Sequence, residues 1–210
     1  SILRPRYLFL ENVKGLLNHE GGATFETILR ALDELGYDVE WQVLNSKDYV
    51  PQNRERVFII GHLRGERTRK VFPLERKNGT TAKNNIKPIN NSKKTRELLN
   101  FDSTNRFYDV NGISPCLNTM QGGDREPKIA VVGNVIANTL LTGEEKAVVT
   151  NNFRIRKLTP RECWRLQGFP DWAFDKAKEV NSDSQLYKQA GNGVTVPVIA
   201  DIASRLDVNG

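Results

Sequence analysis

The sequence predicts an α/β fold joined to a smaller, irregular module. Two short apolar runs, residues 7–10 and 57–60, are typical of strands buried on both faces of a sheet. Between them, apolar residues recur at helical spacing over 25–35, and residues 39–43 alternate as in a strand. Strand, helix and two further strands in this order predict a layered α/β structure.

The pattern divides the chain into three zones. Residues 1–63 carry the α/β pattern. Residues 64–153 lose it, apart from strand-like pieces at 129–132 and 135–137. Residues 154–210 return to helices. Three helices are expected there: a helix that Thr159 caps, a helix over 184–190 that stops at Gly191, and a helix that begins near Pro197.

Composition bounds the protein class. With 210 residues, of which 38% are hydrophobic, the chain can bury a core. Only two cysteines are present, which disfavours a disulfide framework and indicates a reducing compartment. The sequence shows neither a leader nor an apolar run of the roughly 20 residues that span a bilayer. It reads as a cytoplasmic protein, nucleoid-associated if bacterial, whose first residue falls within a domain.

Positive charge is concentrated in one segment. Residues 64–97 carry eleven Lys or Arg against three Glu, a net charge of +8, although the whole chain is only +6. Such a segment favours contact with a polyanion such as DNA, because each cation at a phosphate releases condensed counterions. A solvated loop explains it equally well. Lys93 and Lys94 lie in this segment.

Two motifs place polar groups at strand ends. Glu11 follows an apolar run, near the carboxyl end of a strand, where ligands of open α/β sheets bind. Before the second run, Gln52, Arg54 and Arg56 alternate, so an extended backbone turns them to one face, where they can grip a phosphate or a planar carbonyl. The plainer interpretations are a solvated Glu11 and a solvated strand edge paired with Glu55.

Two further motifs lie near the end of the chain. Residues 154–170 place five basic groups around a capped amphipathic helix, which either braces a core or presents arginines to nucleic acid. Residues 187–197 include Gly191-Asn192-Gly193, which predicts a tight turn with exposed backbone groups. Such a turn can hold a small polar ligand, but it is more often a plain link between helices.

Taken together, these motifs closely resemble the DNA cytosine-5 methyltransferase family. The resemblance rests on Glu11-Asn12-Val13, the run 48–56, the block 156–170 and the closing motif 189–194, all in family order. It implies the C-terminal portion of such an enzyme. Residues 1–63 would complete a Rossmann-like methyltransferase sheet, 64–153 would be the target-recognition region, and 154–210 would support that region and pack closing helices back on the catalytic domain.

The resemblance also implies residue roles. These enzymes swing a cytosine out of double-stranded DNA and methylate its carbon 5 from S-adenosylmethionine. Glu11 would hold the ring nitrogen and amino group of that cytosine, Arg56 its carbonyl, and Arg54 would order the pocket. The cofactor side would be lined by Asn192, Gly193 and Val194. The residues expected to contact DNA are Lys93, Lys94, Arg156, Arg161 and Arg165. No metal and no membrane are expected.

One departure limits the resemblance. The family's nucleophilic cysteine lies in a Pro-Cys loop before Glu-Asn-Val, and the Gly-rich cofactor loop lies earlier still. Neither is found here. Pro115-Cys116 comes after Glu11, and Cys163 reads as a buried structural thiol. The chain is therefore expected to be inactive alone and to bind the cofactor weakly.

Three interpretations stay open. The chain can be a fragment or subunit completed by a second polypeptide, such as an N-terminal half, that carries the cysteine. It can be a DNA-binding remnant without chemistry, or a truncated product without function. Glu11, Arg54 and Arg56 favour the first, because a mere binder does not need them. Methylation regained on mixing with the missing half separates the first from the second.

Overall fold

The computed structural model describes residues 4–75, 107–109, 112–118, 128–132 and 153–206. The chain forms two compact units, residues 1–81 with 194–210 and residues 82–193. We call them the sheet unit and the helical unit. The sequence places its boundaries at 63/64 and 153/154 instead, and the roles assigned to those three zones stay predictions.

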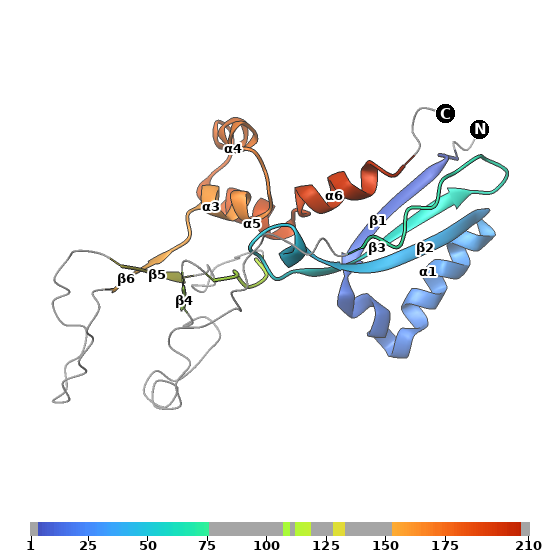
Figure 1. The fold of residues 1–210 in the computed structure, drawn as a ribbon, viewed down its shortest axis with the longest axis horizontal. Coiled ribbons are helices and arrows are strands. Elements are labelled where there is room, and N and C mark those ends of the chain that lie inside the picture. Colours follow the sequence, from blue (N-terminus) through green and yellow to red (C-terminus); the bar gives the residue numbers. More distant parts are fainter. Residues whose placement is uncertain (1–3, 76–106, 110–111, 119–127, 133–152, 207–210) are drawn as a thin grey trace. The chain divides into compact units, whose positions relative to one another are not determined.

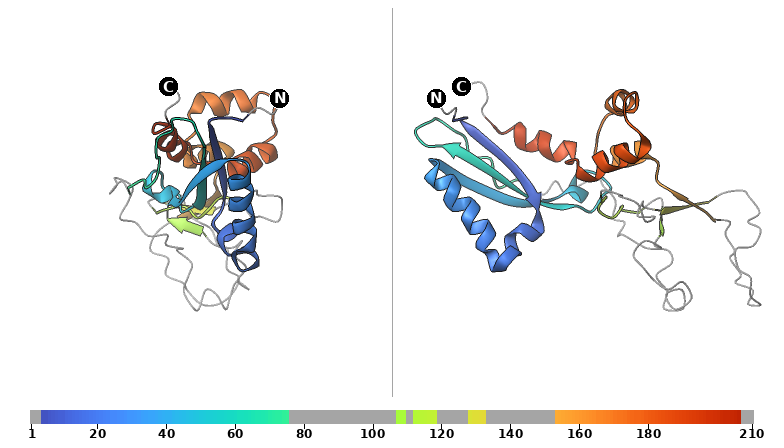
Figure 2. Two further views of the ribbon diagram at one scale, coloured as in Figure 1. Left: turned by 90° about the vertical axis from the view of Figure 1, so that its right-hand side faces the viewer. Right: turned by 180° about the vertical axis from the view of Figure 1, so that it is seen from behind.

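The sheet unit is built on three antiparallel strands. Their order is β1-β3-β2, so that the last strand in sequence lies in the middle. The views from two sides show helix α1 against one face of this sheet and helix α6 against the other (Figures 1 and 2). The elements are β1 (Tyr7–Val13), α1 (Ala23–Glu34), β2 (Tyr37–Asn45), β3 (Glu55–Leu63) and α6 (Val196–Ala203), with 3-10 turns at Lys14–Gly22 and Ser46–Asp48.

The second apolar run confirms its prediction. Residues 57–60 form the middle of β3 and are each at most 3% exposed. Phe58 and Ile60 face a core that includes Val198 and Ile202 of α6. The alternate residues of the run face a second core with α1. Burial on both faces is the reason that this strand reads as a continuous apolar run.

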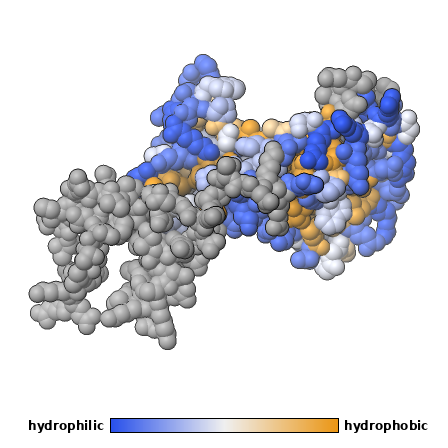
Figure 3. All heavy atoms as spheres, viewed as in Figure 1, coloured by the Kyte–Doolittle hydropathy of each residue, from blue (hydrophilic) through white to orange (hydrophobic). Residues whose placement is uncertain are grey.

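The first run differs from its prediction. Residues 7–9 are only half-buried, Leu10 is 39% exposed and Val13 is 51% exposed. The reason is position: within the described part of the chain, β1 pairs with β3 alone and forms an edge of the sheet. The space-filling view shows hydrophobic residues reaching the surface between hydrophilic ones (Figure 3).

Polar side chains of β2 hold the segment that follows β3. The amide of Gln42 donates to the Leu74 carbonyl (3.0 Å) and accepts from the Leu74 N–H (2.8 Å). The carboxylate of Glu40 accepts from the N–H groups of Val71 (2.6 Å) and Phe72 (3.0 Å). These bonds satisfy backbone groups that a strand partner would otherwise satisfy, and they bury Val71 and Leu74 in the core against α6.

In its described residues, the helical unit combines three short strands and three helices. The strand order is β4-β5-β6, with β4 parallel and β6 antiparallel to β5. The elements are β4 (Phe107–Asp109), β5 (Lys128–Val132), β6 (Phe153–Lys157), α3 (Pro160–Leu166), α4 (Asp171–Lys178) and α5 (Asp183–Asn192). The strand-like piece predicted at 135–137 lies outside the described residues.

The helix ends test the sequence-based predictions. Thr159 and Glu162 form the predicted capping box at the start of α3. The helix predicted over 184–190 does not stop at Gly191 but continues to Asn192, and Gly193 caps it by donating to the Gln189 carbonyl (2.7 Å). Helix α4 was not predicted. In the described ranges, no helix is long and apolar enough to cross a membrane.

Candidate functional site: a carboxylate and two arginines in the sheet unit

Glu11 and Arg56 meet across adjacent strands of the sheet unit. The β1–β3 register sets Glu11 opposite Phe58 and Val13 opposite Arg56, so Glu11 and Arg56 are diagonal neighbours. The Arg56 Nε lies 3.0 Å from the Glu11 Oε1, with side chains 15% and 25% exposed. The fold thus forms an ion pair from two residues that are 45 positions apart in the sequence. Partial burial strengthens the pair, and a polar ligand can still reach it.

Arg54 and Gln52 are buried just before β3. Arg54 is 4% exposed and Gln52 is 0% exposed. The Asn45 side chain shapes this segment, because its Oδ1 accepts from the N–H groups of Lys47 and Arg54 (both 3.1 Å). The solvated-edge interpretation does not hold, since a guanidinium is seldom buried without a purpose and Glu55 pairs with Lys14 instead (3.0 Å).

The sequence placed Gln52 on this face as one of three groups that can grip a phosphate or a planar carbonyl, but the family resemblance implied no role for it. Both atoms of its amide are buried, and neither has a hydrogen-bond partner among the residues that the structure describes. A buried amide without a partner is costly, so it signals a group that a ligand or water completes. The alternate spacing with Arg54 and Arg56 was the available signal.

The closing motif does not form the tight turn that the sequence predicts. Gly191 and Asn192 belong to helix α5, and only 193–195 link α5 to α6. A Cβ on Gly193 would lie 3.0 Å from the Gln189 carbonyl and 3.4 Å from the Phe169 ring, so close packing requires this glycine. The Asn192 side chain is exposed and can bond a polar ligand. Its part in a cofactor site, together with Gly193 and Val194, stays a prediction.

The block 156–170 and the closing motif are joined inside the helical unit. The buried Gln167 donates from its Nε2 to the Ala190 carbonyl (2.7 Å), and the Trp164 Nε1 donates to the Leu186 carbonyl (3.0 Å). Tyr187 in turn donates to the Leu158 carbonyl (2.6 Å). The two motifs therefore occur together because side chains of each satisfy backbone carbonyls of the other.

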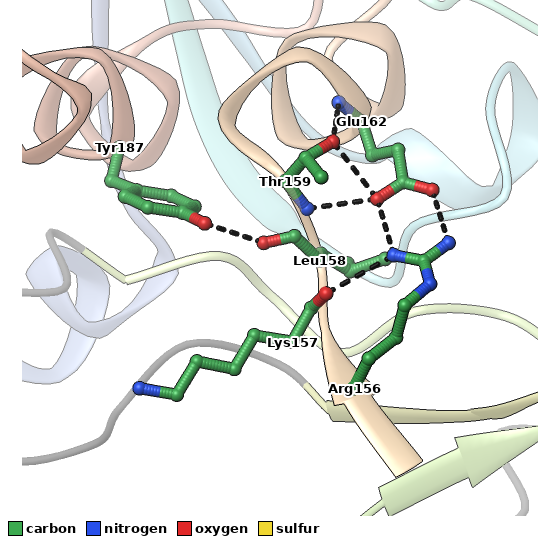
Figure 4. Close-up of polar contacts among 6 residues, drawn as sticks. All are labelled: Arg156, Lys157, Leu158, Thr159, Glu162 and Tyr187. Carbon is green, nitrogen blue, oxygen red and sulfur yellow. Dashed lines mark hydrogen bonds and ion pairs between the residues drawn. The ribbon is translucent and has the colours of Figure 1, made fainter. Parts of the chain in front are cut away.

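The arginines expected to contact DNA each hold an acidic partner. Arg156 binds both oxygens of Glu162 (2.7 and 2.8 Å; Figure 4). Arg165 binds both oxygens of Asp171 (2.8 and 2.6 Å). Arg161 pairs with Asp175, and its guanidinium lies 4.5 Å from the centre of the Phe174 ring. These ion pairs support a role of the three arginines in bracing the helices. Contacts of the same arginines with DNA stay a prediction. Lys93 and Lys94 lie outside the described residues.

The Arg156–Glu162 contact predicts a pH-dependent stability. The Arg156 guanidinium, with the bonds from Thr159, lowers the pKa of Glu162 to about 2 against the opposing effect of burial. A lowered folded-state pKa stabilises the fold above the unfolded value of about 4.3, and this contribution is lost as pH falls from there towards 2. Since the pair is about one-third exposed, Glu162→Gln should cost only about 1 kcal/mol at pH 7.

Urea unfolding of the helical unit, followed at pH 7 and near pH 2, measures this cost. The difference between Glu162→Gln and the parent should shrink at the lower pH. Glu179→Gln, which removes an exposed i,i+3 pair with Lys176, is the matched control and should cost less than about 0.5 kcal/mol at both. An equal cost for the two variants would contradict the assignment.

The two cysteines differ in exposure. Cys163 is 0% exposed and packs in the core of the helical unit, as the sequence predicts for a structural thiol. Cys116 is exposed, and its Sγ lies 3.5 Å from the Leu117 carbonyl oxygen. Within the described ranges, no cluster of His, Cys, Asp or Glu could hold a metal ion.

Comparison with known proteins identifies the family. The family model for C-5 cytosine-specific DNA methylase matches residues 1–207. The chain is 37% identical over 217 residues to the type II methyltransferase M.Bsp6I of Bacillus sp. (strain RFL6), covering 97% of the chain and 65% of that protein. It is 31% identical over 293 residues to the orphan methyltransferase M.SPBetaI of Bacillus phage SPbeta, covering 97% and 66%.

Solved structures give the same fold. The Entamoeba histolytica methyltransferase EhMeth has a TM-score of 0.63 at 20% identity, covering 97% of this chain and 63% of its own. The S. pombe Dnmt2 methyltransferase has a TM-score of 0.60 at 17% identity, covering 95% and 64%. The protein thus has an α/β fold similar to that of these methyltransferases.

The expectation of a C-terminal portion is wrong. The model for a C-5 cytosine-specific DNA methylase is matched over residues 1–207, nearly the whole chain, and this overturns the expectation of a C-terminal portion. At the same time, the chain spans only part of these relatives, 65% of the length of M.Bsp6I and 66% of the length of M.SPBetaI. The chain belongs to the C-5 cytosine-specific DNA methylase family.

Proposed function

We propose that this protein takes part in methylating carbon 5 of cytosine in double-stranded DNA, in the manner of a restriction–modification methyltransferase. The Glu11–Arg56 ion pair carries the proposal. A carboxylate and a guanidinium at 3.0 Å, both partly buried, offer acceptor and donor groups close to each other. That arrangement suits the edge of a flipped pyrimidine, which presents an amino group, a ring nitrogen and a carbonyl.

The residues of this chain would grip the base. Glu11 would hold the amino group and ring nitrogen, while Arg56 would donate to the carbonyl. Arg54, buried just before β3, would hold the Arg56 side of the pocket in place. These contacts favour the transition state because they stabilise charge that builds on the ring when a thiolate adds to carbon 6.

Asn192, Gly193 and Val194 would line one side of the cofactor. S-adenosylmethionine, when bound, supplies the methyl group that carbon 5 receives. One wall provides few contacts, so residues 1–210 alone should bind this cofactor with a Kd well above the micromolar range. Isothermal titration calorimetry measures it, and a micromolar Kd for the chain alone would contradict the assignment of a single wall.

The nucleophile would come from outside residues 1–210. Cys163 is fully buried, and Cys116 follows Glu11 in the chain, whereas the family's Pro-Cys loop precedes it. A thiolate is the group that adds to carbon 6, so a cysteine on another stretch of polypeptide would complete the site.

DNA binding would depend on the basic segment. Lys93→Glu with Lys94→Glu should weaken binding to duplexes of any sequence, because lost phosphate contacts are not sequence-specific. With two or three such contacts, the parent's affinity should fall about 10- to 100-fold between about 50 and about 200 mM salt, and the variant's fall should be smaller.

Fluorescence anisotropy with labelled duplexes tests this dependence. Arg30→Glu is a matched charge reversal on α1, where Arg30 pairs with Glu26 (2.7 Å), and it should leave the salt slope unchanged. An affinity that does not respond to salt, or to the change at Lys93 and Lys94, would indicate a solvated loop.

A DNA-binding protein without chemistry is the second candidate. It is favoured by the two cysteines, since neither matches the family's nucleophile. Mixing with a polypeptide that carries the family's Pro-Cys and Gly-rich loops separates the two. A methyltransferase gains transfer activity, and a pure binder does not.

A further inference from the structure

Two buried hydroxyl groups join distant parts of the sheet unit. The Ser46 Oγ and the Thr195 Oγ1 are 2.6 Å apart, and the residues are 4% and 3% exposed. Ser46 opens the segment that leads to Arg54 and Arg56, and its N–H donates to the Arg54 carbonyl (2.9 Å). Thr195 directly follows Val194 and is the N-cap of α6.

Thr195 does not use its side chain to cap its own helix. A threonine at the N-cap commonly accepts from an N–H of the first turn, and here the side chain makes no such bond. Its carbonyl accepts from Val198 (3.1 Å) and Ile199 (3.2 Å), and its hydroxyl is turned to Ser46. The hydroxyl thus links the segment of Arg54 to α6 instead of stabilising α6 alone.

A second contact runs beside the first. The Tyr49 hydroxyl donates to the Asp201 Oδ2 (2.7 Å), about two turns further along α6. Burial, together with this bond, raises the pKa of Tyr49 above its usual range, so the hydroxyl remains a donor at neutral pH. Together with the core contacts of Val198 and Ile202, these two hydrogen bonds attach α6 to the segment at two points along the helix.

We propose that Ser46 and Thr195 are positioning residues that hold Val194, on the cofactor side, at a set place relative to the segment carrying Arg54 and Arg56. This inference rests on the proposed function. A peptide bond joins Val194 to Thr195, and the Ser46 N–H donates to the Arg54 carbonyl. The hydrogen bond between Ser46 and Thr195 therefore connects Val194, on the cofactor side, with the segment of Arg54, on the base side. A shift of Val194 would weaken cofactor binding before it affected the base.

Removing both hydroxyls together separates positioning from stability. Each single variant, Ser46→Ala or Thr195→Val, leaves the other hydroxyl buried without this partner and should destabilise the fold. The double variant removes both groups and should recover much of the lost stability. In the reconstituted complex it should nevertheless raise the KM for S-adenosylmethionine about tenfold, with kcat and the KM for DNA within about threefold. The single variant Thr195→Ser keeps the hydroxyl, so its KM for S-adenosylmethionine should stay close to that of the parent.

Amide hydrogen exchange on the free chain gives a readout without activity. The amides of Val198 and Ile199 donate to the Thr195 carbonyl, so in the double variant they should exchange about tenfold faster. Those of Ile59 and Ile60 in the central strand should be unchanged. Thr27→Val removes a hydroxyl that bonds only within α1 and is the matched control for both readouts.

The outcomes separate the two proposals. A double variant with the parent's KM and exchange rates overturns the positioning role. If the parent complex transfers no methyl group, the proposed function fails, and the exchange of Val198 and Ile199 alone decides whether the pair holds this turn. A raised KM with unchanged exchange would also overturn it, because the effect would not pass through Thr195.

Discussion

Replacing Glu11 with Gln should lower methyl transfer about 10²- to 10³-fold in a complex that supplies the thiolate, while duplex binding changes less than about threefold. The change keeps the size of the side chain but removes the carboxyl group that would pass a proton to the ring nitrogen, where negative charge builds as the thiolate adds. It also removes the ion pair with Arg56. Duplex binding should be spared, because the contact proposed for Glu11 is to the flipped base, whereas phosphate contacts dominate affinity.

Transfer of a tritiated methyl group measures the rate of the reaction, and fluorescence anisotropy with a labelled duplex measures DNA affinity. Both are measured on the same preparation of the complex. Arg56→Ala should behave like Glu11→Gln. Glu55→Gln is the matched control, because Glu55 is an acid on the same pair of strands that binds Lys14 instead. It should keep activity within about twofold. A complex that stays active with Glu11→Gln would remove Glu11 from the site.

Residues 1–210 alone should incorporate no methyl group above background. Carbon 5 of cytosine is a poor nucleophile until a thiolate adds to carbon 6, and Cys163 is fully buried. Transfer should begin when a polypeptide with the family's Pro-Cys and Gly-rich loops is added. The edge of β1 offers a place for it, since Leu10 and Val13 are exposed there and β3 is this strand's single partner in the described part of the chain.

Cysteine variants show where the thiolate lies. Cys116→Ser should leave the rate of the complex within about twofold, because Cys116 is assigned no part in the chemistry. Replacing the cysteine of the added polypeptide should abolish transfer. Activity of the chain alone that is lost with Cys116→Ser would make Cys116 the nucleophile and overturn the proposal.

The local pattern predicted several elements correctly for identifiable reasons. The run 57–60 is buried on both faces, so its composition had no polar alternation to obscure it. Thr159 and Glu162 bond within one turn, which sequence spacing alone specifies. The run 7–10 misled, because an edge strand and a central strand can have the same composition. Gly191 misled as well, since the helix ends where Gly193 meets the Gln189 carbonyl.

By itself, the sequence determined the family motifs and the α/β class, and it singled out Glu11, Arg54 and Arg56 as candidates, because these depend on residue type and short-range spacing. Only the tertiary structure decided that Glu11 and Arg56 are paired, that Arg156, Arg161 and Arg165 each hold an acid, and that Ser46 meets Thr195. The physical reason is that an ion pair or a buried hydrogen bond depends on which side chains strand register and helix packing bring within about 3 Å, and no local pattern encodes that distance.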